Sequence, residues 1–267
     1  HPITGGKQIV CENWRNLVSV GAKPLAITNC LNFGNPENKE VMGEFAECLE
    51  GIKEACEFLN YPVVSGNVSF YNGTNQKNID PTPVIGGVGL INNLSKLMGN
   101  SFKEDKSVIL LIGKTFGHLE QSCFLKENYS IFNGMPPEIN LLNEKNNGEN
   151  VLKLIQDDLV LSVHDVSNGG LIVALSEMAM SSNYGVKIQK PKKLSNMFEY
   201  FFGEDQGRYI LEISPDNSNK VEKILKNNNI YFENIGFTQK EYVEIEGEFK
   251  SSVKDLFKIN NEWYNTY

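Results

Sequence analysis

The segment 63–72 (VVSGNVSFYN) reads as a strand interrupted by residues that could bind a ligand. Gly66 lies inside it, and a glycine within a strand often marks a bulge or a close backbone approach to a ligand. Asn67 and Ser69 are two residues apart, so on a strand both side chains project from one face. An amide oxygen suits a hard cation such as Mg²⁺, and a hydroxyl suits a phosphate or ribose oxygen. A bulged strand edge with a polar outer face is the alternative interpretation.

The segment 28–37 (TNCLNFGNPE) reads as a strand that ends in a polar loop before a helix. Its asparagines Asn29, Asn32 and Asn35 each offer one amide donor and one carbonyl acceptor. One interpretation is an ordinary capped helix entry, because asparagine favours caps and turns. The other is a ligand site, because α/β proteins bind ligands at the carboxyl ends of strands.

The segment 162–175 (SVHDVSNGGLIVAL) indicates a strand, a Gly-Gly turn and the start of a helix. The free N–H groups and the dipole at a helix start can bind an anion. His164 and Asp165 could orient a ligand or transfer a proton, but no serine or cysteine nucleophile is recognisable beside them. A structural histidine next to a helix cap is therefore the favoured interpretation. The turn matches neither the dinucleotide-binding nor the P-loop glycine pattern.

An acidic turn, 201–209 (FFGEDQGRY), is the remaining cluster of charges. Glu204, Asp205 and Arg208 predict a solvated turn with surface ion pairs, which is the usual state of such a group. No functional role is assigned to it from the sequence.

Two mixed α/β regions must position these residues. Apolar residues at helical spacing predict helices over 8–20 and 41–59, and apolar runs predict strands over 24–28, 61–72 and 81–92. After a polar stretch at 98–107, the patterns predict strands at 108–113, 159–163, 208–214, 230–237 and 242–246 and helices at 150–157, 171–180 and 218–228. The stretch 140–150 predicts a loop or the approach to a helix. We expect an α/β (α+β) protein with domains at 1–98 and 99–267.

Composition narrows the classes of partner and compartment. The formal net charge of −8 disfavours nucleic acid and anionic membrane surfaces. No apolar run has the length of a membrane span, and the start HPITGG resembles no signal peptide, so a cytoplasmic location is expected. The five cysteines are an odd number without zinc-ribbon spacing, which indicates free thiols in a reducing compartment.

Four stretches carry a family resemblance: NWRNLVSVGAKPLAITNCLNFGNPE, EGIKEACEFLNYPVVSGNVSFYN, PTPVIGGVGLI and HDVSNGGLIVALSEMA. In this order and spacing, over nearly the whole chain, they resemble the second half of phosphoribosylformylglycinamidine synthase. That family belongs to the aminoimidazole ribonucleotide synthetase-like superfamily. The resemblance implies a partial N-terminal-type mixed-sheet domain, whose sheet joins its counterpart in a barrel-like core, followed by a C-terminal-type α/β domain.

The resemblance also implies a reaction. The family converts formylglycinamide ribonucleotide to its amidine with ATP, Mg²⁺ and ammonia from glutamine, an ATP-dependent carbon–nitrogen ligation. The expected partners are the N-terminal half of the same enzyme, a glutaminase subunit and a small accessory subunit. The first half of the family's chain supplies the catalytic histidines and most metal ligands. No catalytic residue is therefore expected in this chain, and the chain alone is expected to be inactive.

Site residues follow from the same resemblance. Gly66 and Asn29 correspond to ATP contacts, Asn67 to a Mg²⁺ ligand and Ser69 to a substrate contact. Many relatives carry aspartate at the position of Asn29, where an amide accepts a hydrogen bond but adds no negative charge.

The start of the chain departs from the family pattern. HPITGG corresponds to a DP-x-x-GG-like start with His1 in place of aspartate, and the family has further strands before it. A fragment with an unpaired sheet edge is expected, which could form a homodimer through that surface.

An alternative function is a catalytically silent half that holds a nucleotide near His164 and Asp165 without turning it over. An independent kinase-like enzyme is disfavoured, because the first strands and an acidic cluster are missing.

Overall fold

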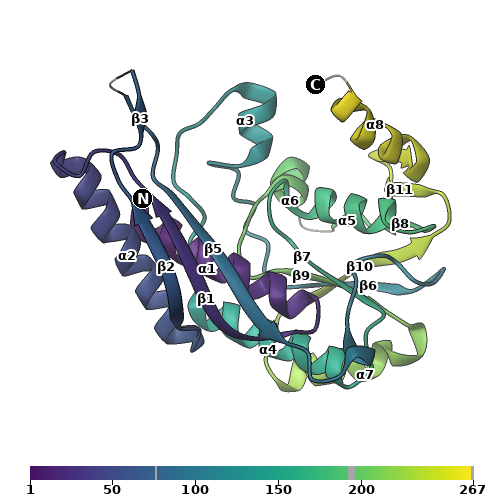
Figure 1. Cartoon of the computed structure of the whole chain (residues 1–267). Helices are drawn as coiled ribbons and strands as arrows, with labels where there is room; N and C mark the ends of the chain where they lie inside the picture. Colours follow the sequence, from purple (N-terminus) through teal and green to yellow (C-terminus); the bar gives the residue numbers. More distant parts are fainter. Residues whose placement is uncertain (76, 192–195, 266–267) are drawn as a thin grey trace.

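The computed structural model describes residues 1–75, 77–191 and 196–265. A three-stranded and a seven-stranded β-sheet, each packed against helices, carry the fold (Figure 1). In the described residues no helix combines the length and apolarity of a membrane span.

The three-stranded sheet has the order β2-β1-β5 and contains the segments singled out above. Its central strand β1 (Lys23–Asn32) pairs in parallel with β2 (Val63–Ser69) and antiparallel with β5 (Thr82–Leu90). The parallel pair requires a crossover connection, which is the helix α2 (Lys39–Leu59). A short hairpin of β3 (Gly73–Thr74) and β4 (Lys77–Asn78) extends from the end of β2.

Helices cover one face of this sheet. The apolar stripes of α1 (Pro2–Ser19) and α2 bury Ile27 and Leu31 of β1 in a common core. The opposite face bears Val84, Val88 and Leu90 of β5, which are 53%, 58% and 48% exposed. We call this second side, through β2, β1 and β5, the uncovered face.

The seven-stranded sheet has the order β12-β11-β8-β10-β6-β9-β7. Its strands in chain order are β6 (Val108–Ile112), β7 (Ser162–Asp165), β8 (Gly185–Ile188), β9 (Tyr209–Ile213), β10 (Phe232–Gln239), β11 (Tyr242–Ile245) and β12 (Phe249–Ser252). The helices around it are α3 (Cys123–Tyr129), α4 (Leu141–Gln156), α5 (Gly170–Met180), α6 (Met197–Phe202), α7 (Pro215–Asn227) and α8 (Val253–Asn265), and a 3₁₀ turn (Leu94–Lys96) joins the two regions.

Two apolar cores sandwich the larger sheet. On one face α5 and α6 pack against alternate residues such as Ile109 and Leu111. On the other face α4 and α7 pack with Leu110 and Ile112, in the same core that includes Ile27. One core therefore runs without interruption from the first region into the second, whereas the boundary at 98/99 stays a prediction.

The stretch 140–150, expected as a loop or helix approach, is the first part of α4. Asn140 caps this helix, because its side-chain oxygen accepts a hydrogen bond from the Asn143 amide at 3.0 Å. Gly148 lies inside the helix because a side chain there would collide with the ring of Trp14 on α1. The glycine serves a close helix–helix approach, which the sequence pattern does not reveal. The sequence also missed the short elements α3, β8, α6 and β12 and the terminal helix α8.

Candidate functional site

Strand β2 carries Asn67 and Ser69 on one face. Its pairing with β1 is continuous from Thr28 to Asn32, placing Cys30 opposite Asn67 and Asn32 opposite Ser69. The irregularity in this pair lies earlier, between Ile27 and Thr28, and not at Gly66. Because side chains alternate along a regular strand, Asn67 and Ser69 share the uncovered face. This part of the prediction agrees with the structure, and the two roles stay predictions.

The side chain of Asn67 is free to bind a ligand. The residue is exposed and makes no side-chain hydrogen bond or ion pair with any residue that the structure describes. Its amide oxygen can therefore ligate a hard cation without breaking an internal contact.

Ser69 is partly buried and its hydroxyl is already held by a neighbour. The amide nitrogen Nδ2 of Asn72 lies 3.1 Å from Ser69 Oγ, 3.0 Å from the Ser69 carbonyl oxygen and 3.0 Å from the Phe33 carbonyl oxygen. Asn72 thereby ties the end of β2 to the chain that leaves β1.

Asn29 and Gly66 face each other on neighbouring strands, and the Asn29 side chain lies over the glycine. A side chain at position 66 would collide with Asn29 Oδ1. Both residues belong to the face on which Leu31 is buried, opposite to the face of Asn67 and Ser69. The four predicted site residues thus form two pairs on two faces. Gly66, Asn67 and Ser69 lie on the outer strand β2, and Asn29 lies beside Gly66 on the central strand β1.

The other two asparagines after β1 have structural contacts. Asn35 Oδ1 accepts a hydrogen bond from the Glu37 amide at 2.9 Å, and Asn32 Nδ2 lies 3.4 Å from the Thr82 carbonyl oxygen. Asn38 caps α2 by accepting from the Glu40 amide at 2.8 Å. For these residues the structure supports the turn-and-cap interpretation.

His164 is held between two carboxylates. Its Nε2 lies 3.0 Å from Glu177 Oε2 and its Nδ1 lies 3.4 Å from Asp165 Oδ1. Burial would lower the pKa of His164, but the hydrogen bonds to Asp165 and Glu177 outweigh it and raise that pKa to about 9. The histidine is therefore charged at neutral pH and both ring nitrogens are engaged, which supports the structural interpretation.

The predicted anion position at the start of α5 is filled by the protein itself. Glu204 Oε1 accepts a hydrogen bond from the Gly169 amide and another from the Cys123 amide at the start of α3, each at 2.8 Å. Gly169 and Gly170 have φ values of +77° and +72°, which explains the pair of glycines. A carboxylate thus already occupies the site that the helix dipole favours.

The prediction that 201–209 is a solvated turn is wrong. Asp205 is 4% exposed and Arg208 is 0% exposed. The Asp205 carboxylate accepts from the Phe116 and Gly117 amides at 2.9 Å. Arg208 donates to the carbonyl oxygens of Asp205 and Gly203 and makes no ion pair within the described part of the chain. Burial lowers the pKa of Arg208 to about 10.

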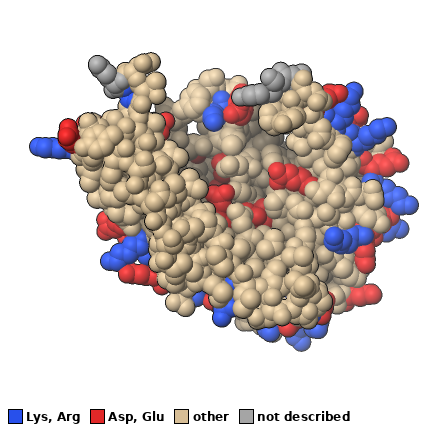
Figure 2. Space-filling view, viewed as in Figure 1, with Lys and Arg blue, Asp and Glu red and all other residues tan. Residues whose placement is uncertain are grey.

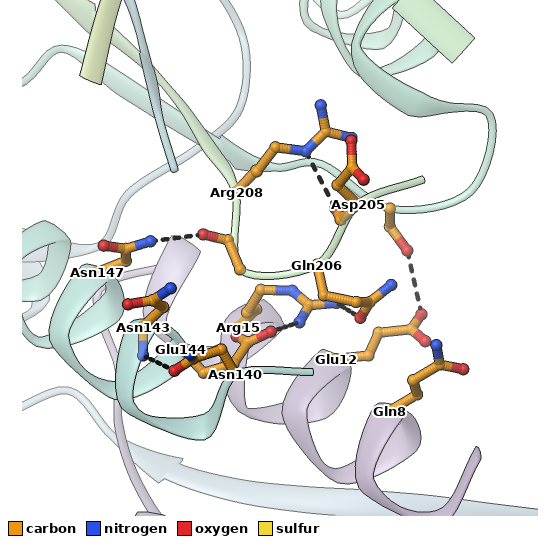
Figure 3. Close-up of polar contacts among 12 residues, drawn as sticks. Gln8, Glu12, Arg15, Asn140, Asn143, Glu144, Asn147, Asp205, Gln206 and Arg208 are labelled. Atoms are coloured by element: carbon orange, nitrogen blue, oxygen red, sulfur yellow. Dashed lines mark hydrogen bonds and ion pairs between the residues drawn. The ribbon is translucent and has the colours of Figure 1, made fainter. Parts of the chain in front are cut away.

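An ion pair that the sequence did not suggest lies beneath this turn (Figure 3). Arg15 Nη1 on α1 is 2.7 Å from Glu144 Oε1 on α4, and both side chains are 1% exposed. Arg15 Nη2 also donates to Gln206 Oε1 at 2.9 Å. Arg15 follows the core residue Trp14, and that position was the one available signal. Its partner Glu144 fell in the stretch taken for a loop.

A cavity of about 920 Å³ opens beside these residues, lined in part by Asn143, Glu144 and Gln206. Figure 2 shows acidic side chains gathered in the hollow on this side of the molecule. Across the described ranges, no group of three or more His, Cys, Asp or Glu residues could hold a metal ion.

Two family models match successive parts of the chain. Residues 1–91 match the AIR synthase related protein, N-terminal domain, and residues 104–246 match the corresponding C-terminal domain. The chain is 54% identical over 267 residues to the phosphoribosylformylglycinamidine synthase subunit PurL of Pelagibacter ubique (strain HTCC1062). That match covers all of this chain and 37% of the relative.

Two solved structures show the same fold. PurL of T. maritima complexed with FGAR has a TM-score of 0.76 at 19% identity, over 96% of this chain and 43% of that chain. The same protein complexed with ATP has a TM-score of 0.74 at 18% identity, over 96% and 42%. The expected fold class, an N-terminal-type mixed-sheet region followed by a C-terminal-type α/β region, is confirmed.

Proposed function

The chain belongs to the AIR synthase related protein family, and we propose that it acts as the C-terminal half of phosphoribosylformylglycinamidine synthase. In this role it contributes nucleotide, metal and substrate contacts to the ATP-dependent conversion of formylglycinamide ribonucleotide to its amidine. The observation that supports this proposal most directly is the pair on one face of the outer strand β2, an exposed Asn67 and a partly buried Ser69. The ATP and FGAR complexes of the T. maritima relative support the choice of ligands.

Each residue of the site has one part in this proposal. ATP supplies the phosphoryl group that makes the substrate's amide oxygen a leaving group for ammonia, and Mg²⁺ offsets phosphate charge. Asn67 holds the cation through its amide oxygen, and Ser69 orients the ribonucleotide through its hydroxyl. Asn29 on β1 and Gly66 on β2 contact the nucleotide from their facing positions. These four residues bind and position, and none of them is a general acid or base.

The site needs a second protein part. Asn67 is neutral, and the described residues offer no cluster of acidic or histidine ligands for a cation. The uncovered face with Val84, Val88 and Leu90 is an exposed apolar surface of the kind that a partner protein covers. We assign this surface to the N-terminal half of the enzyme, and ammonia to a glutaminase subunit acting on glutamine with a small accessory subunit. Free thiols such as Cys11 and Cys48 support a cytoplasmic location.

A full-length chimera tests the proposal. This chain replaces the aligned segment of the Pelagibacter ubique relative, and amidine formation is followed with ATP, Mg²⁺ and an ammonium salt as nitrogen source. We expect activity, and Asn67→Ala should raise the Mg²⁺ concentration needed for half-maximal rate by about tenfold, the effect of losing one charge-assisted contact. The matched control is Asn140→Ala, which removes the cap of α4 in the second region of the chain. An unchanged Mg²⁺ dependence in Asn67→Ala would overturn the proposal.

The silent nucleotide-holding half is less well supported. The start of α5 is hydrogen-bonded to Glu204, and His164 is bonded to Asp165 and Glu177. The position near His164 and Asp165, where a silent half would hold its nucleotide, therefore offers few free groups. Calorimetry of this chain with ATP, with and without Mg²⁺, separates the two functions. Tight one-to-one binding by the chain alone would favour the silent site, and ATP hydrolysis by the chain alone would favour a kinase-like enzyme.

A further inference from the structure

The turn after β2 is held in an uncommon conformation. Tyr71 has a φ of +61°, in the left-handed region that aromatic residues rarely adopt. Its amide donates to the Gly34 carbonyl oxygen at 2.9 Å, and the Asn72 amide donates to the Phe33 carbonyl oxygen at 3.2 Å. The turn is thus fastened by its backbone to the chain that leaves β1, and the Asn72 side chain is brought back beside Ser69.

The contacts of Asn72 define which way its amide faces. The carbonyl oxygens of Phe33 and Ser69 can only accept hydrogen bonds, and both lie 3.0 Å from Asn72 Nδ2. The nitrogen must therefore face them. The same nitrogen is 3.1 Å from Ser69 Oγ, within the range of an N–H···O bond, whereas Asn72 Oδ1 at 3.3 Å is beyond the range of a good O–H···O bond.

We propose that Asn72 is a positioning residue that makes the Ser69 hydroxyl a hydrogen-bond donor toward an oxygen of the bound ribonucleotide. The two N–H bonds of Asn72 face three acceptors, so one of them is shared between a carbonyl oxygen and Ser69 Oγ. With this N–H directed at a lone pair of Ser69 Oγ, the hydroxyl proton points away from Asn72 and outward from the strand. A hydroxyl that accepts one hydrogen bond is also a better donor. The ligand group that it recognises is therefore an acceptor, a phosphate or ribose oxygen. This inference rests on the proposed function of Ser69.

Substitution by aspartate distinguishes positioning from packing. Asn72→Asp keeps the size of the side chain but replaces the N–H donors by a carboxylate oxygen, which accepts the Ser69 proton and turns the hydroxyl away from the ligand. In the chimera, Asn72→Asp should raise the KM for formylglycinamide ribonucleotide about 3- to 10-fold, the value of one hydrogen bond, and leave the KM for ATP unchanged. Asn72→Ala should show a smaller rise.

A double-substitution cycle with Ser69→Ala provides the decisive readout. If Asn72 acts through the hydroxyl, adding Asn72→Asp or Asn72→Ala to Ser69→Ala should leave the KM for the ribonucleotide within about twofold of Ser69→Ala alone. The matched control is Asn78→Ala. Asn78 Oδ1 accepts a hydrogen bond from the Asn35 amide at 3.0 Å and so holds the chain that leaves β1, but it makes no hydrogen bond with Ser69. This control should leave both KM values unchanged.

The outcomes separate the inference from the function on which it rests. If Ser69→Ala raises the KM and the Asn72 substitutions raise it further by the same factor in both backgrounds, positioning is overturned and the proposed function stands. If Ser69→Ala leaves the KM unchanged, both are overturned. Should Asn72→Asp not fold, the Asn72→Ala cycle decides by the same criterion, with the melting temperature of each variant measured alongside.

Discussion

Arg15 on α1 and Glu144 on α4 form an ion pair that is closed to solvent and joins the two regions of the chain. Burial alone would lower the pKa of Arg15, but the Glu144 carboxylate outweighs it and raises that pKa, so the guanidinium stays charged. Two charges in such a place are stable as a pair and unfavourable singly.

We therefore predict that Glu144→Ala lowers the free energy of unfolding by about 3–5 kcal/mol, because it leaves a buried cation unpaired. Urea denaturation followed by circular dichroism measures the change. The control is Glu222→Ala, which removes the Lys226 partner on the exposed side of α7 and should cost less than about 1 kcal/mol. Equal effects of the two substitutions would contradict the importance of burial.

The His164 contacts predict a stability that depends on pH. Because the pKa rises from 6.5 to about 9 on folding, the stabilisation is fully present below pH 6.5 and is lost as the pH rises through about 9. Thermal unfolding of the chain and of His164→Gln should differ by on the order of 2 kcal/mol at pH 6 and converge near pH 10. A difference between the two proteins that is constant over this range would count against the charged histidine.

Gly66 is required by its neighbour on β1. We predict that Gly66→Ala lowers the free energy of unfolding by about 1–3 kcal/mol, because the methyl group collides with Asn29 Oδ1. Adding Asn29→Ala should recover part of this loss, because it removes the side-chain collision but leaves the Asn29 carbonyl oxygen 2.8 Å from the added carbon. Gly43→Ala, in a part of α2 with open space around the glycine, is the control and should stabilise by about 0.5–1 kcal/mol. No recovery in the double variant would show that another contact demands the glycine.

Glu204 links the first turns of α3 and α5. Glu204→Ala should lower the free energy of unfolding by about 1–2 kcal/mol, since two helix-start amides lose their acceptor. Glu204→Gln keeps an acceptor oxygen and should cost about half as much. Chemical denaturation of both variants measures the difference, and a larger loss in the glutamine variant would refute the capping role.

The pattern of residues within one segment was enough to predict structural features that depend on a single strand or a single helix. The spacing of Asn67 and Ser69 placed both side chains on one face because alternation is a property of the strand itself. Alternation also places Gly66 on the face opposite to Asn67. The register that brings Asn29 over Gly66 depends on pairing between distant segments, so neither strand alone predicts it. The resemblance supplied their roles, and the pairing supplied their geometry.

Long-range packing accounts for the predictions that were wrong. Asp205 looked like a surface charge because its acceptor function is satisfied by amides of 116–118, which are distant in sequence. The stretch containing Gly148 was predicted as a loop or the approach to a helix, because the demand for a glycine comes from Trp14 on another helix. In both cases the deciding contact joins segments that no window along the chain contains.

Among the residues that the structure describes, a core that runs from Ile27 through β6 to α7 joins the two regions of the chain in one apolar interior. A rotation of the three-stranded sheet relative to the seven-stranded sheet would disrupt the packing of apolar side chains in this shared core. Under the proposed function, ligands would then enter and leave at β2 through movement of this chain as a unit against the N-terminal half proposed to cover Val84, Val88 and Leu90, or through movement of the short β3–β4 hairpin beside the site.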